Sequence, residues 1–129
     1  MRKILVVDDD PAVRRLVRDV LECEGYHVDT VDDGASALLH IASHRPHCVV
    51  LDVMMPGLDG HEVLARLRDQ DAGGPALPVV MLTAAANDDQ AWQAWSGGVD
   101  YFLAKPFDPS ELLRYLDRLF EPHPSPAAR

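Results

Sequence analysis

Five polar side chains in the sequence have types and positions that could act together chemically. Each one follows the end of a short apolar run, either directly or within one or two residues: Asp8, Asp9, Asp52, Thr83 and Lys105. If these runs are parallel strands, their carboxyl ends meet at one edge of a sheet, where open α/β proteins bind their ligands. The spacing therefore predicts that three carboxylates, a hydroxyl and an ammonium group converge.

Three carboxylates placed together repel one another, because each makes the ionisation of its neighbours more costly. Mg²⁺ relieves this repulsion, since it binds one or two carboxylates, keeps some waters and completes its octahedron with phosphate oxygens. A carboxylate nucleophile, a metal ion and a lysine suffice for phosphoryl transfer, which needs mainly in-line positioning and neutralised charge. The residue types alone do not distinguish which of Asp8, Asp9 and Asp52 is the nucleophile.

Two kinds of segment alternate along the chain and would position these groups. Short apolar runs typical of strands cover residues 4–7, 28–31, 48–51, 79–82 and 101–103. Segments with apolar residues at helical spacing cover residues 11–24, 35–43, 61–68, 88–96 and 109–120. This alternation predicts parallel strands joined by right-handed crossovers with helices on both faces, which is a doubly wound α/β domain.

Residues typical of helix starts and turns lie at the expected boundaries of these elements. Asp10 and Asp108 each precede a proline, as expected of a helix N-cap followed by proline at the first helical position. Gly57 and Gly60 are interpreted as turn glycines, since the backbone after Asp52 must bend.

The length and composition restrict the function. The 129 residues form about one domain, which we assign to residues 1–120, with 121–129 as a flexible tail or truncated linker because this stretch holds three prolines and no periodicity. No run approaches the roughly 20 apolar residues of a membrane span, no secretory signal is present, and two cysteines fit a reducing compartment. We therefore expect a cytoplasmic protein without a membrane partner. A net charge of −9 argues against direct nucleic-acid binding.

Four segments closely resemble the motifs of the response regulator receiver family, the CheY-like domains of two-component signal transduction. They are residues 4–10 (ILVVDDD), 51–60 (LDVMMPGLDG), 81–84 (MLTA) and 105–107 (KPF). Each fragment alone is weak evidence, but all four stand in the right order at predicted strand ends. The resemblance spans roughly residues 2–120 and implies a flavodoxin-like sheet of five parallel strands, in the order 2-1-3-4-5, with five helices.

The resemblance also implies a role for each site residue. It makes Asp52 the phosphoacceptor and assigns Mg²⁺ to Asp9, Asp52 and the backbone carbonyl of Met54, with Asp8 joining through water. The phosphoryl oxygens would be contacted by Thr83 and Lys105, and the peptide bond that precedes Pro106 would be cis.

In such a switch, phosphorylation draws the threonine and the lysine inward and an aromatic side chain follows, which here is Phe102. The expected output surface is the fourth helix, fifth strand and fifth helix, at about 87–120, where Trp92 is a candidate partner contact. The implied phosphate donor is a sensor histidine kinase or a phosphotransfer protein. The resemblance further allows a homodimer that forms on phosphorylation.

Two other functions compete with a switch that is not a turnover enzyme. A Mg²⁺-dependent phosphohydrolase with an aspartate nucleophile usually carries a second catalytic aspartate two residues later, where this chain has Met54. A degenerate receiver that only docks partners would have lost a residue of the acidic pocket, and none is lost. His40 and His44 have the i,i+4 spacing of a zinc-binding pair, with His47 nearby, but we interpret these three as solvated surface histidines.

Overall fold

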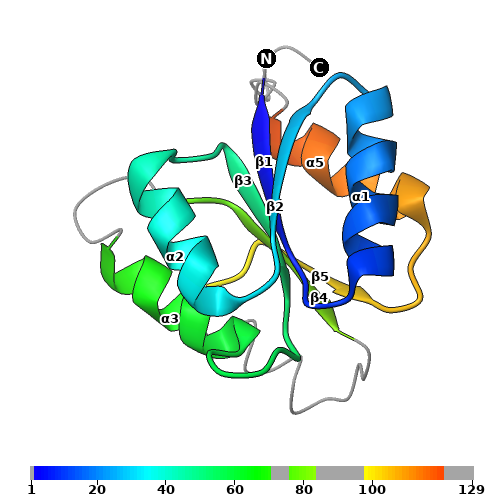
Figure 1. Ribbon diagram of the computed structural model, residues 1–129. Coiled ribbons are helices and arrows are strands. Elements are labelled where there is room, and N and C mark those ends of the chain that lie inside the picture. Colours follow the sequence, from blue (N-terminus) through cyan, green and yellow to red (C-terminus); the bar gives the residue numbers. More distant parts are fainter. Residues whose placement is uncertain (1, 71–75, 84–97, 121–129) are drawn as a thin grey trace.

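The protein folds into a five-stranded parallel sheet with helices on both faces (Figure 1). The structure is a computed structural model that describes residues 2–70, 76–83 and 98–120. The strands are β1 (Lys3–Val7), β2 (His27–Val31), β3 (Cys48–Asp52), β4 (Val79–Thr83) and β5 (Tyr101–Ala104). The described helices are α1 (Pro11–Cys23), α2 (Gly34–Ser43), α3 (Gly60–Gln70) and α5 (Pro109–Phe120).

The sheet order is β2-β1-β3-β4-β5 and every neighbouring pair is parallel. This confirms the predicted fold class and strand order. The helix predicted at 88–96 lies outside the described residues, as does the tail at 121–129. Within the described part of the chain, no helix has both the length and the apolar character needed to cross a bilayer.

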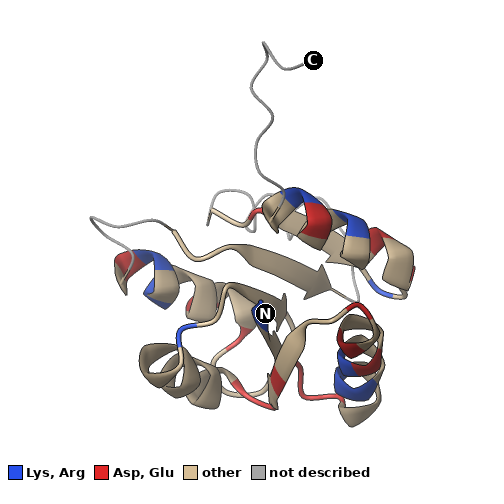
Figure 2. Ribbon diagram, turned by 90° about the horizontal axis from the view of Figure 1, so that it is seen from above, with Lys and Arg blue, Asp and Glu red and all other residues tan. Residues whose placement is uncertain are grey.

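Alternate residues of each strand point to opposite faces of the sheet and build two separate cores. One core joins Leu5, Val49, Leu51 and Met81 to helices α2 and α3, through Ala37, Ile41, Val63, Leu64 and Leu67. The other joins Ile4, Val6, Val50, Val80 and Leu82 to helices α1 and α5, through Val17, Leu21, Leu112 and Leu116. Seen from a second direction, the sheet lies between these two pairs of helices (Figure 2). Burial on both faces explains why the central strands are continuous apolar runs.

The described helices begin within one residue of their predicted starts. The Asp10 carboxylate accepts a hydrogen bond from the backbone N–H of Ala12 at 2.9 Å, and that of Asp108 accepts one from Ser110 at 3.0 Å. Helix α2 begins one residue earlier than predicted, because Asp33 caps it through the backbone N–H of Ser36 at 2.7 Å.

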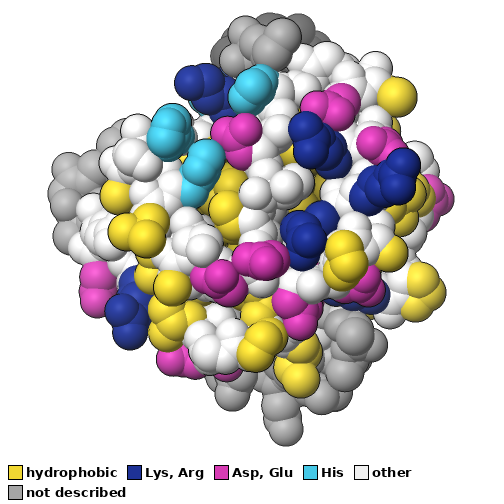
Figure 3. Space-filling model, viewed as in Figure 1, with side chains coloured by type: hydrophobic (Ala, Val, Ile, Leu, Met, Phe, Trp, Pro, Cys, Tyr) yellow, Lys and Arg dark blue, Asp and Glu magenta, His cyan; other side chains and the backbone are white. Residues whose placement is uncertain are grey.

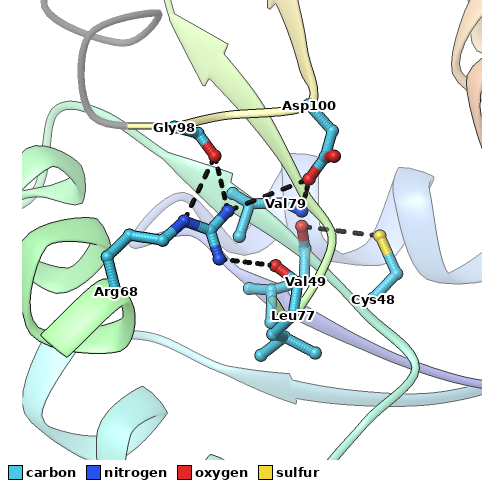
Figure 4. A network of polar contacts seen from close by, with 7 residues as sticks. All are labelled: Cys48, Val49, Arg68, Leu77, Val79, Gly98 and Asp100. Carbon is cyan, nitrogen blue, oxygen red and sulfur yellow. Dashed lines mark hydrogen bonds and ion pairs between the residues drawn. The ribbon is translucent and has the colours of Figure 1, made fainter. Parts of the chain in front are cut away.

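Arg68, at the end of α3, ties the starts of β4 and β5 together (Figure 4). Its Nε and Nη2 donate to the carbonyl of Gly98 at 3.1 and 2.6 Å, and its Nη1 donates to that of Leu77 at 2.8 Å. Its Nη2 also lies 3.8 Å from Oδ2 of Asp100, and this oxygen accepts a hydrogen bond from the backbone N–H of Val79 at 2.8 Å. One guanidinium group therefore holds two strands at the end of the sheet opposite their carboxyl edge.

Replacing Arg68 by alanine should destabilise the fold by about 2–3 kcal/mol, because two carbonyl groups lose charge-assisted hydrogen bonds. Urea unfolding measures this change. The matched control is Arg66→Ala on the same helix, where the side chain is exposed and the change should stay within about 0.5 kcal/mol. Equal effects at the two positions would contradict the assigned role of Arg68.

Candidate functional site

The topology brings four of the predicted side chains to one edge of the sheet. Asp8 directly follows β1, Asp52 ends β3, Thr83 ends β4 and Lys105 directly follows β5. Asp52 and Thr83 are thus the last residues of their strands, one position further into the sheet than predicted. All four strands are parallel, so their carboxyl ends coincide.

Three of these polar side chains are buried. Asp8 and Thr83 have no exposed surface and Asp52 is 2% exposed, and these three are the buried polar residues of the described part of the chain. Asp9 is exposed beside them. Burying carboxylates is costly unless opposite charge or hydrogen bonds compensate.

The ammonium group of Lys105 provides part of that compensation. Its Nζ lies 2.8 Å from Oδ2 of Asp8 and 3.2 Å from Oδ1 of Asp52. Burial alone would lower the pKa of Lys105, but the two carboxylates outweigh this effect and the net shift is upward. The backbone N–H of Lys105 also donates to the carbonyl of Thr83 at 2.6 Å, which joins the two strand ends. The peptide bond from Lys105 to Pro106 is cis, as the resemblance implied.

The two buried carboxylates differ in how their oxygens are used. Asp8 accepts hydrogen bonds at both oxygens, from the backbone N–H of Asp10 at 2.9 Å and from Lys105. Oδ1 of Asp52 has an ion-pair distance to Lys105 but no hydrogen bond of good geometry among the described residues. Oδ1 of Asp52 is therefore less fully compensated than either oxygen of Asp8.

The residues fit a hard divalent cation. Asp8, Asp9 and Asp52 can each offer one carboxylate oxygen, and these ligand atoms lie within 4.8 Å of one another. Two buried carboxylates face a single ammonium group, so negative charge remains uncompensated, and an all-oxygen ligand set suits Mg²⁺. Met54 follows Asp52 by two residues with its side chain 58% exposed. The predicted use of its carbonyl oxygen stays a prediction.

The segment after Asp52 is held by backbone contacts. The N–H of Val53 donates to the carbonyl of Leu82, and the N–H of Gly60 donates to that of Val53, both at 2.9 Å. The interpretation of Gly57 as a turn glycine fits its φ of +76°. Gly60 has no positive φ, and a Cβ there would collide with the backbone of Asp52 and Val53. Gly60 is therefore required because the backbone of Asp52 and Val53 lies too close to it for a side chain, which the sequence pattern did not indicate.

The sequence also predicts Phe102 as a switch residue and Trp92 as a partner contact. Phe102 is partly buried and packs against the core that faces α2 and α3. Trp92 lies outside the described residues. A contact of Asp8 was not predicted from the sequence: Nη1 of Arg14 donates to its backbone carbonyl at 2.7 Å. An arginine on a polar helix face carries no sequence signal for such a contact.

The surroundings of Asp52 shift its pKa upward. Burial raises the pKa of Asp52 to about 6, and the nearby Asp8 carboxylate adds to this rise, while Lys105 opposes it. A raised pKa means that, without a bound cation, ionised Asp52 is less stable in the folded protein than in water. A cation at this edge of the sheet would reduce that difference.

The sequence matches a known protein family and curated proteins. The family model of the response regulator receiver domain matches residues 4–117. The response regulator MprA of Mycobacterium sp. (strain KMS) is 48% identical over 111 residues, which cover 86% of this chain and 47% of that protein. The chain thus spans about half the length of the curated relatives it matches.

Solved structures extend the similarity to the whole fold. The receiver domain of the Francisella response regulator 1452 superposes with a TM-score of 0.86 at 31% identity, covering 94% of this chain and 98% of that one. The response regulator protein TrrA from Thermotoga maritima, solved in complex with Mg²⁺-BeF, gives 0.82 at 33% identity, covering 93% and 100% of the two chains.

The raised pKa of Asp52 predicts how pH affects stability in EDTA. The folded-state pKa is about 6 against an ordinary value of 3.8, so the folded state binds a proton more readily than the unfolded state. Stability is therefore lost as pH rises from about 4 to about 6, and the loss is complete above that range. At about pH 7, Asp52→Asn should be about 2–3 kcal/mol more stable than the wild type, a difference that disappears near pH 4.

Urea unfolding between about pH 4 and pH 8 measures this difference. The control is Asp69→Asn, an exposed carboxylate on α3, which should show no pH-dependent difference of that size. Added Mg²⁺ should stabilise the wild type more than Asp52→Asn. A stability difference that stays constant from pH 4 to pH 7 would show that Asp52 is not the titrating group.

Proposed function

Because the chain belongs to the response regulator receiver family, we propose that it is a phosphorylation switch of two-component signalling that accepts a phosphoryl group on Asp52. The observation that carries this proposal is the position of the Asp52 carboxylate: buried, 3.2 Å from the Lys105 ammonium group and beside two further carboxylates. The receiver comprises residues 1–120 in this proposal.

The contacts support Asp52 as the nucleophile over its two neighbours. Asp8 has both oxygens engaged in hydrogen bonds, one of them with Lys105. Asp9 is exposed, so water competes for its oxygens. Asp52 combines burial, a nearby ammonium group and an oxygen that has no hydrogen-bond partner among the described residues, which favours it as the attacking group.

In the reaction, a carboxylate oxygen of Asp52 forms a bond to phosphorus while the bond between phosphorus and the donor breaks. A Mg²⁺ ion, held by Asp9, Asp52 and the Met54 carbonyl with Asp8 joining through water, would neutralise negative charge on the transferred group. Lys105, now paired with Asp8 and Asp52, contacts a phosphoryl oxygen. The hydroxyl group of Thr83 donates a hydrogen bond to another phosphoryl oxygen.

The register of β4 and β5 supports a coupled movement of Thr83 and Phe102. Met81 pairs with Phe102, and Thr83 pairs with Ala104. Residues two apart on a strand share a face, so Thr83 and Phe102 lie diagonally on the same side of the sheet. Movement of Thr83 toward the phosphoryl group would leave space behind it, which Phe102 could enter. The output surface in this proposal is the fourth helix, β5 and α5, with Trp92 as a partner contact and a homodimer as one outcome.

The surroundings of Lys105 offer an approach for the phosphate donor. A largely apolar groove of about 440 Å³ beside it is lined by Val13, Leu16, Pro106 and Phe107, and Leu16 is 47% exposed. We assign the donor to a sensor histidine kinase or phosphotransfer protein of the cytoplasm. With a net charge of −9, the chain is not expected to bind nucleic acid directly.

Incubation with acetyl phosphate and Mg²⁺, followed by intact mass measurement, tests the proposal. The wild type should gain one phosphoryl group, whereas Asp52→Asn and the wild type in EDTA should gain none. Lys105→Ala should be labelled at least about tenfold more slowly, because the transferred charge loses its cationic partner. Lys3→Ala, an exposed lysine at the opposite end of the sheet, is the matched control and should be labelled like the wild type.

If Asp52→Asn gained as much phosphoryl label as the wild type, the phosphoacceptor would be a different residue. Rapid turnover of p-nitrophenyl phosphate would instead favour a phosphohydrolase. That second function is disfavoured by Met54, since the position two residues after the nucleophile has an exposed thioether and not a carboxylate.

A further inference from the structure

Asp9 is the carboxylate of the acidic site whose side chain has the least support. It is exposed, whereas Asp8 and Asp52 are buried. Within the described part of the chain, its carboxylate has no hydrogen bond or ion pair. The position of this ligand oxygen therefore depends on the backbone that carries the side chain.

The two peptide groups that flank Asp9 are each held by one polar contact. The N–H of Asp10 belongs to the peptide group after Asp9, and it donates to Oδ1 of Asp8 at 2.9 Å. The carbonyl of Asp8 belongs to the peptide group before Asp9, and it accepts a hydrogen bond from Nη1 of Arg14 at 2.7 Å. Because a peptide group is planar, holding this carbonyl also holds the Cα of Asp9, which lies in the same plane.

We propose that Arg14 is a positioning residue, which holds Asp9 where its carboxylate can bind Mg²⁺. This inference rests on the proposed function, in which Asp9 is a Mg²⁺ ligand. A hydrogen bond from a charged donor is stronger than one between neutral groups. Partners that orient metal ligands without touching the metal are typically worth roughly 10–100-fold in metal affinity.

The place of Arg14 in the fold suits this role. It lies near the start of α1, where its backbone N–H donates to the carbonyl of Asp10 at 3.1 Å, and its side chain is half-buried. Together with Arg15, Arg18 and Thr30 it lines a surface hollow of about 510 Å³ between α1 and β2. In Figure 3, Lys and Arg side chains gather over α1, with acidic side chains beside them. A shorter side chain at position 14 would enlarge this hollow and leave the two hydrophobic cores intact.

Arg15 allows positioning to be separated from a simple effect of charge. It is exposed, it follows Arg14 directly, and among the described residues it makes no hydrogen bond or ion pair. Removing either arginine deletes one positive charge from the start of α1, and this alone would strengthen the binding of a cation. Loss of positioning would weaken it. The two effects therefore have opposite signs.

Titration with Mg²⁺, followed in amide ¹H–¹⁵N spectra, tests the proposal. Arg14→Ala should bind Mg²⁺ about tenfold more weakly than the wild type, whereas Arg15→Ala should bind it at least as tightly as the wild type. Arg14→Lys keeps a charged donor without the guanidinium geometry, so its binding should be only about threefold weaker.

A spectrum without metal provides a second readout. In EDTA, the ¹³C signal of the Asp8 carbonyl should shift in Arg14→Ala, because this oxygen loses its hydrogen bond. The same signal should stay unchanged in Arg15→Ala.

The positioning role is overturned if Arg14→Ala binds Mg²⁺ as tightly as the wild type or more tightly, or if Arg15→Ala weakens binding equally. If Arg14→Ala does not fold, Arg14→Lys and Arg15→Lys form the test pair, and equal affinities of these two would overturn it. In these cases the wild type still binds Mg²⁺, so the proposed function stands. A wild type that binds no Mg²⁺ would instead refute the proposed function together with this inference.

Discussion

The placement of two buried carboxylates beside one ammonium group is the constraint on which the rest of the site depends. Asp8 and Asp52 are almost completely removed from water, and Lys105 reaches both. One positive charge cannot balance two negative charges in a medium of low polarity, so the ion-free site keeps an excess of negative charge. The sheet carries this cost because its hydrophobic cores on both faces fix the three strand ends independently of their electrostatics.

The fold could be predicted because its signals are local. Apolar runs, helical spacing and the Asp-Pro pairs at positions 10–11 and 108–109 each depend on a few neighbouring residues, and the strict alternation of strands and helices leaves a parallel sheet as the simplest arrangement. The predicted ends were less accurate. Helix α2, capped by Asp33, begins one residue before its predicted start, and Asp52 and Thr83 belong to their strands.

The site residues could be predicted as a group because parallel strands end together. The contacts that support them join residues distant in sequence and have no periodic signature. Gly60 is required by the backbone of Asp52, Arg14 contacts the carbonyl of Asp8, and Arg68 reaches Gly98 across 30 positions. Likewise, the spacing of His40 and His44 indicated a surface pair, but only the structure adds Asp29 from the neighbouring strand.

The contacts of Arg68 also determine how a disturbance could travel through the sheet. They immobilise β5 where it begins, near Asp100, whereas the other end of this short strand leads directly to Lys105. β5 pairs with β4 along its length, but only its start also has these contacts with Arg68. Displacements at the Lys105 end would therefore shrink along β5 toward Asp100, and Phe102, which lies between these two residues, would turn more readily than it would shift.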